Sequence, residues 1–135
     1  MKHLILVSAL ILLIGCGGSS TPPTITGQWT GTATSTIGSG TAGLSANFTQ
    51  GATNANGSTP FSGTIALTSS CLSVVTVTNG AITSGAFALS GSATDGSALT
   101  VTATINSQDT QITGTYVLTG GSVCPNDRGS FALTK

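Results

Sequence analysis

Apolar and polar residues alternate along most of the chain after residue 26, which is the period of a β-strand with one buried face. The segment 97–106 shows this alternation most clearly, because threonines dominate its other face. Its apolar face carries Leu99, Val101, Ala103 and Ile105. No segment of useful length has the period of an amphipathic helix. The pattern predicts strands at about 27–36, 41–50, 59–68, 71–78, 81–90, 97–106, 110–119 and 128–134.

Short turn segments separate these strands. Asn79-Gly80 and Asp95-Gly96 are dipeptides that favour two-residue hairpins. Connections this short force neighbouring strands to pair antiparallel. We therefore expect an all-β fold, an eight-stranded antiparallel up-and-down (meander) β-barrel, with a β-sandwich as the alternative. Barrel closure is favoured because it removes exposed sheet edges, which a chain with few charges protects poorly.

One phrase, a glycine followed by alternating apolar residues, recurs along the chain. It occurs as FSGTIALT (61–68), TSGAFALS (83–90), ITGTYVLT (112–119) and DRGSFALT (127–134). In each copy the glycine shares a face with the large residues after it. Because a glycine in a strand permits a bend or leaves room for a bulky neighbour, we interpret the repeat as architectural, with each copy forming one stave of the barrel.

The N-terminal segment follows a different pattern. Lys2 precedes an apolar run over residues 4–14, and small residues follow, as in an export signal. The run is shorter than the roughly 20 apolar residues of a membrane-spanning helix. The sequence LIGC (13–16) resembles the lipobox of bacterial lipoproteins, which implies that Cys16 is acylated. An ordinary secretory signal with a cysteine near its end is the alternative.

The resemblance to lipoproteins divides the chain into three parts. Residues 1–15 are then a signal peptide, residues 16–25 the acylated cysteine and a flexible tether, and residues 26–135 a single β-barrel domain. Gly17, not aspartate, follows the cysteine. The resemblance therefore implies an exported protein held in the membrane by its acyl chains, in the outer membrane where the host has one.

Charge and chemistry exclude several functions. The chain has only 3 Lys and Arg and 3 Asp and Glu, and its one histidine, His3, lies in the signal segment. Nucleic-acid binding needs a basic patch, so we expect no nucleic-acid partner. Nucleophilic catalysis needs a general base, usually histidine. Asp95 and Asp109 fall in turns, where aspartate bonds its own backbone, so we expect no enzyme and no cofactor.

Two cysteines remain besides Cys16. Because disulfides form in oxidising compartments outside the cytoplasm, we expect Cys71 and Cys124 to form one. Two buried free thiols are the alternative. We expect no metal site, because two sulfurs without histidine or glutamate cannot complete a tetrahedral shell.

The sequence GQWTG (27–31) opens the first predicted strand, and Arg128 opens the last. This pairing resembles the calycin group of lipocalins, fatty-acid-binding proteins and avidins. The resemblance implies that Gly27, Trp29 and Arg128 close the barrel floor, with the guanidinium over the indole. The predicted interior also carries the candidate ligand-lining residues Phe48, Phe61, Phe87, Tyr116 and Phe131.

Two functions follow from these expectations. The first is a lipoprotein of the cell envelope whose barrel is filled by its own side chains and has a structural or interaction role, with an envelope protein as its partner. The alternative is a calycin-like carrier that binds a small apolar ligand. In both, the membrane is a partner through the N-terminal acyl chains.

Overall fold

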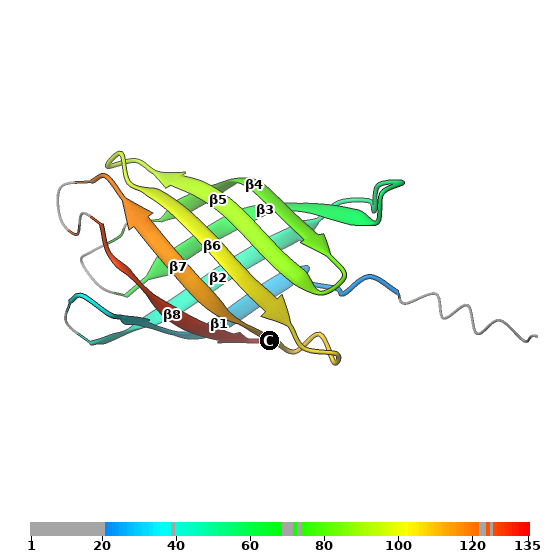
Figure 1. Ribbon diagram of the computed structural model, residues 1–135, viewed down its shortest axis with the longest axis horizontal. Coiled ribbons are helices and arrows are strands. Elements are labelled where there is room, and N and C mark those ends of the chain that lie inside the picture. Colours follow the sequence, from blue (N-terminus) through cyan, green and yellow to red (C-terminus); the bar gives the residue numbers. More distant parts are fainter. Residues whose placement is uncertain (1–20, 39, 69–71, 73, 122–123, 125) are drawn as a thin grey trace, which may run out of the picture.

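The chain folds into a closed antiparallel barrel whose strands follow one another in sequence order (Figure 1). The computed structural model describes residues 21–38, 40–68, 72, 74–121, 124 and 126–135. The strands are β1 (Gly27–Ser35), β2 (Thr41–Gln50), β3 (Ser58–Leu67), β4 (Val75–Thr83), β5 (Ala86–Ala93), β6 (Ala98–Ile105), β7 (Gln111–Thr119) and β8 (Arg128–Thr134). The predicted eight-stranded up-and-down barrel is confirmed.

The pairing of β1 with β8 closes the sheet on itself. Its register runs from Thr30 opposite Thr134 to Ser35 opposite Gly129. This pairing rules out the alternative of two open, facing sheets. Within the described part of the chain, no helix has the length and apolar character needed to cross a membrane.

The two ends of the barrel carry different segments of the chain. We call the right-hand end in Figure 1 the base; the chain enters β1 there, and Lys135 follows β8 there. We call the opposite end the far end. The β2–β3, β4–β5 and β6–β7 connections (51–57, 84–85 and 106–110) lie at the base, whereas β1, β3, β5 and β7 end, and β2, β4, β6 and β8 begin, at the far end.

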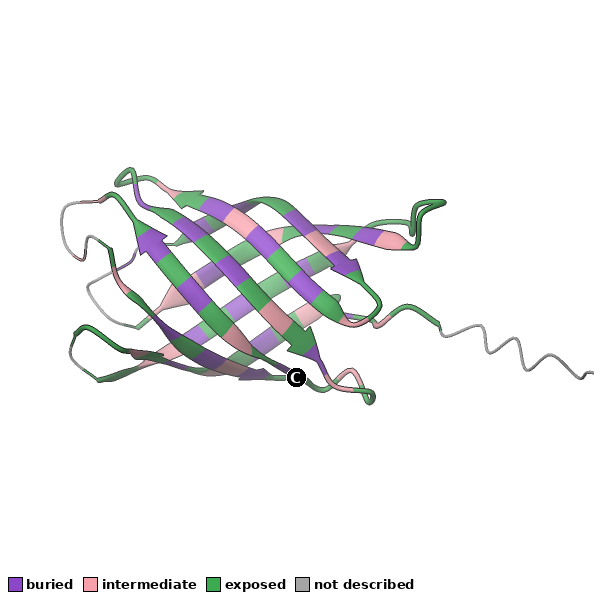
Figure 2. Ribbon diagram, viewed as in Figure 1, coloured by how far each residue is buried: buried purple, intermediate pink, exposed green. Residues whose placement is uncertain are grey.

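Burial alternates along every strand, so that purple and green bands succeed one another in Figure 2. In β6, Leu99 and Val101 are buried, whereas Thr100 and Thr102 between them are exposed. The apolar side chains therefore turn toward the barrel axis, and hydroxyl-bearing side chains cover much of the outside.

One predicted turn is wrong. Asn79 and Gly80 lie inside β4, where the register with β5 shifts between Val77 and Asn79. The hairpin lies instead at Ser84 and Gly85, both with positive φ angles, 50° and 80°. A Cβ atom on Gly80 would come within 2.6 Å of the Phe61 ring. The glycine therefore makes room for an interior aromatic side chain and does not turn the chain.

The repeated glycines have two structural roles. A Cβ atom on Gly129 would lie 1.9 Å from the Thr34 carbonyl oxygen, and one on Gly63 would lie 2.0 Å from the Asn47 carbonyl oxygen. At these positions glycine lets neighbouring strands approach closely as the sheet coils. Gly85 differs, because it lies in the β4–β5 turn.

Candidate functional site

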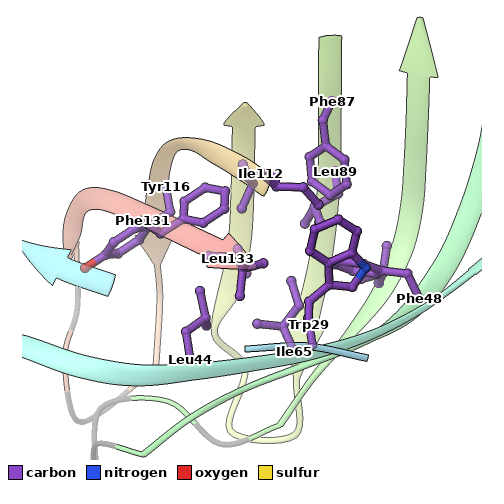
Figure 3. Packing of buried hydrophobic residues seen from close by; sticks show 14 of the residues in the cluster. Trp29, Leu44, Phe48, Ile65, Phe87, Leu89, Ile112, Tyr116, Phe131 and Leu133 are labelled. Carbon is purple, nitrogen blue, oxygen red and sulfur yellow. The ribbon is translucent and has the colours of Figure 1, made fainter. Parts of the chain in front are cut away.

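Three phenylalanine rings fill the half of the interior nearer the base. The Phe61 and Phe87 rings stack with centroids 4.7 Å apart, and Phe48 meets them edge-on at 5.3 and 5.7 Å. All three side chains are at most 6% exposed. Figure 3 shows Phe48 and Phe87 beside Trp29 in the interior. Offset and edge-to-face packing of this kind is favourable beyond the area that it buries, so this half of the barrel is a solid core.

Trp29 closes the base. Its side chain is fully buried, and its indole Nε1 donates a hydrogen bond of 2.7 Å to the carbonyl oxygen of Ile25, which is also fully buried. The Lys135 Nζ atom lies 5.4 Å from the centroid of the Trp29 ring. A cation at this distance over an indole face is attracted by about 0.5–1 kcal/mol at an exposed site.

The expectation that Arg128 covers this indole is wrong. Arg128 is exposed at the far end, where its carbonyl oxygen accepts hydrogen bonds from the main-chain N–H and the hydroxyl of Thr36. The strands β1 and β8 run antiparallel, so the first residue of β8 lies far from the first residue of β1. Lys135, which follows the last residue of β8, takes the place over the ring.

Strand direction was the signal that could have identified Lys135 in advance. In an antiparallel pair, the end of one strand lies beside the start of the other. Gly27, the third residue of the predicted floor, fits this arrangement. A Cβ atom on Gly27 would lie 3.7 Å from the Lys135 Cε atom. Gly27 and Trp29 both lie at the base beside Lys135.

A small apolar cavity of about 40 Å³ lies in the other half of the barrel, toward the far end. Phe48, Phe87, Tyr116 and Phe131 line this cavity, whereas Phe61 does not. The remaining lining residues are Ala33, Leu44, Ile65, Leu67, Leu72, Leu89, Leu99, Val101, Leu118, Asp127 and Leu133. Pockets for drug-sized ligands measure about 300–1,000 Å³, so the cavity is far smaller than those.

Tyr116 and Asp127 form the polar edge of this cavity. The Tyr116 hydroxyl donates to Asp127 Oδ2 at 3.0 Å, and Ser35 Oγ donates to Oδ1 at 2.5 Å. The main-chain N–H of Arg128 also donates to Oδ1, at 2.8 Å. The Ser35 hydroxyl oxygen in turn accepts a hydrogen bond from the main-chain N–H of Gly38. This network joins the β7–β8 connection to the β1–β2 connection.

The network also perturbs the tyrosine. Burial, and then the hydrogen bond to Asp127 and its negative charge, raise the pKa of Tyr116 to about 12. A phenol with a raised pKa remains protonated and acts as a donor at neutral pH. Asp127 accepts three hydrogen bonds from these partners, so its carboxylate holds the far end together.

The other two aspartates bind main-chain groups. Asp95 Oδ1 accepts a hydrogen bond from the Ser97 N–H at 3.0 Å, and this bond lowers the pKa of Asp95 below its ordinary value. Asp109 Oδ2 accepts one from the Thr24 N–H at 2.9 Å, at the base. Among the described residues, no three His, Cys, Asp or Glu side chains gather in a way that could hold a metal ion.

Some predicted site residues fall outside the described ranges. The lipobox and Cys16 belong to residues 1–20, and Cys71 also lies outside the ranges. Cys124 is partly buried and packs against the hydrophobic core. The acylation of Cys16 and the Cys71–Cys124 disulfide therefore stay predictions.

The arrangement combines a sealed base, an aromatic core and a small apolar cavity with one polar edge. Comparisons of the chain with protein-family models, with curated proteins and with solved structures find no match.

Proposed function

We propose that the protein is a lipoprotein of the cell envelope, anchored through acyl chains on Cys16, whose barrel has a non-catalytic structural or interaction role. The sequence LIGC at 13–16 supports the anchor and its export, and the glycine after the cysteine supports an outer-membrane location. A disulfide between Cys71 and Cys124 is part of the proposal, because it is expected in an oxidising compartment.

The observation that carries the proposal is the filled interior. The aromatic core occupies the half of the barrel toward the base, and the remaining cavity measures about 40 Å³. An eight-stranded barrel is just wide enough for its own side chains or one small ligand. Here side chains take up the space, which favours a barrel that presents its surface to a partner.

The polar groups of the cavity support a non-catalytic role. A general base must have a lone pair directed at the proton that it removes. The Asp127 carboxylate instead binds Tyr116, Ser35 and the main chain of Arg128. Its hydrogen bonds hold connections of the barrel in place.

A carrier of a small apolar ligand is the second candidate, and the cavity favours it. The cavity wall is almost entirely apolar, and the Tyr116–Asp127 pair could orient a polar group at its edge. A ligand much larger than the cavity requires rearrangement of side chains such as Phe131.

The proposal is tested by mass spectrometry of the full-length protein purified from host membranes. We expect a mass that includes acyl chains on Cys16, and we expect Cys16→Ser to remove them and release the protein from the membrane. Unmodified Cys16 would contradict the anchor. Native spectra of the same material separate the two candidates: a bare polypeptide barrel supports the structural role, and a co-purified lipid supports the carrier.

A further inference from the structure

The segment just before β1 is bound to the base of the barrel. Ile25 is fully buried, and Pro23 is partly buried. We call residues 23–26 the latch. The stretch 16–25 was expected to be a flexible tether, but its last residues are held by groups that lie far away in the sequence.

Gln50, the last residue of β2, binds the latch through both the oxygen and the nitrogen of its side-chain amide. Its Oε1 accepts a hydrogen bond of 2.9 Å from the Ile25 N–H, and its Nε2 donates one of 3.0 Å to the Pro23 carbonyl oxygen. The Gln50 main-chain N–H also donates to the Thr26 hydroxyl at 3.0 Å. One residue thus contacts the latch at three positions.

Three other elements complete the attachment. Asp109, in the β6–β7 connection, accepts a hydrogen bond from the Thr24 N–H, and Lys135 Nζ donates one to the Thr24 carbonyl oxygen at 3.2 Å. Trp29 donates to the Ile25 carbonyl oxygen. The latch therefore contacts groups from β1, the end of β2, the β6–β7 connection and the residue after β8.

We propose that the latch fixes the orientation of the barrel on the membrane, with the base against the lipid surface and the far end turned away. The proposal rests on the proposed function, because it requires acyl chains on Cys16. The latch leaves only a short segment between the acylated residue and the barrel, and that segment meets the barrel at the base.

Chain length makes the inverted orientation unfavourable. Residue 23 follows Cys16 by seven positions, so the intervening chain reaches at most about 25 Å when fully extended. A strand of nine residues such as β1, tilted by about 40°, rises about 23 Å along the barrel axis. To place the far end on the membrane, the chain would have to be almost fully extended along the barrel wall. With the base on the membrane, no such extension is required.

The orientation decides which surface meets a partner. The far end carries the cavity and the Tyr116–Asp127 network. Ile37 and Val74, in connections at this end, are about half exposed, at 55% and 54%. With the base on the membrane, these apolar groups face the aqueous compartment.

The test uses the full-length acylated protein in vesicles of phosphatidylethanolamine and phosphatidylglycerol that contain a lipid with a nitroxide on its headgroup. A fluorophore is attached to an introduced cysteine, Ser107→Cys at the base or Thr94→Cys at the far end. Both positions are exposed and lie in connections. We expect strong nitroxide quenching of the Ser107→Cys probe and little quenching of the Thr94→Cys probe.

The latch is tested by adding Gln50→Ala and Asp109→Ala to each probe protein. We expect the difference in quenching between the two probes to shrink, because the released tether lets the barrel reorient. Gln111→Ala, which changes an exposed glutamine on β7, is the matched control and should keep the difference. Circular dichroism confirms that each variant is folded.

The outcomes separate the two proposals. Equal quenching of both probes, or stronger quenching at Thr94→Cys, in a protein that carries acyl chains overturns the orientation and leaves the lipoprotein assignment intact. A difference that survives release of the latch overturns the role of the latch. A mass without acyl chains overturns the proposed function and this inference with it.

Discussion

The indole N–H of Trp29 donates a hydrogen bond of 2.7 Å to the carbonyl oxygen of Ile25, four residues earlier, and both residues are fully buried. This hydrogen bond ties the latch to the first strand. Buried polar groups without partners are costly, so each group depends on the other.

We expect Trp29→Phe to lower the free energy of unfolding, because the ring volume is partly kept but the Ile25 carbonyl oxygen loses its donor. Leaving a buried acceptor unpaired costs about 1–3 kcal/mol. Urea unfolding followed by circular dichroism measures the change. Lys135→Met is the matched control that removes only the cation over the ring. It should lower the free energy of unfolding less than Trp29→Phe does. An unchanged midpoint for Trp29→Phe would show that the hydrogen bond contributes nothing.

The raised pKa of Tyr116 predicts that the folded protein loses stability in alkaline solution. Its pKa is about 12 in the folded protein against an ordinary value of 10.0. The folded state thus holds the phenolic proton more tightly than the unfolded state. The resulting stabilisation is fully present below pH 10 and is lost as the pH rises through about 12.

Phenolate absorbance measures this titration directly, because Tyr116 is the one tyrosine in the chain. We expect the folded protein to titrate well above the urea-unfolded protein. Asp127→Asn removes the negative charge and should lower the folded value. A folded protein that titrates like the unfolded one would contradict the burial of this hydroxyl.

We expect Gly129→Ala to weaken the seam between β8 and β1. The added methyl group would lie 1.9 Å from the Thr34 carbonyl oxygen, so the two strands must separate. Overpacking of a tight site costs about 1–3 kcal/mol, occasionally more. Thermal unfolding reports the loss. Ser130→Ala, at the neighbouring exposed position of β8, should change the melting temperature little; an equal effect of both variants would refute the steric explanation.

The predicted disulfide has its own test. Alkylation of the protein without and with reduction, followed by peptide mass spectrometry, should show Cys71 and Cys124 linked. A bridge that closes a loop of about 50 residues stabilises by about 4 kcal/mol in the loop-entropy model. We expect Cys71→Ser combined with Cys124→Ser to lose about that much. Alkylation of both cysteines without reduction would show free thiols instead.

The strands could be predicted because their alternation has a period of two residues. Leu99, Val101 and Ile105 are buried as this alternation predicts, and the Asp95-Gly96 turn lies between β5 and β6 as expected. Local pattern was sufficient in these cases, because each side chain faces inward or outward according to its own strand.

Features set by contacts between distant residues could not be predicted in this way. Asn79-Gly80 has the composition of a turn, but Gly80 lies within a strand and makes room for the Phe61 ring of the neighbouring strand. The latch depends on Gln50 and Asp109, which follow Ile25 by 25 and 84 positions. No local sequence pattern indicates these contacts, because they form only when the sheet closes.

The pairing of β1 with β8 also affects the tendency of copies of the protein to associate. The chain carries so few charged side chains that electrostatic repulsion between copies is weak. An unpaired strand would then be a template for fibril growth. Closure of the sheet therefore limits association between copies in place of charge repulsion, and a variant with an opened seam should form fibrils at concentrations where the wild type does not.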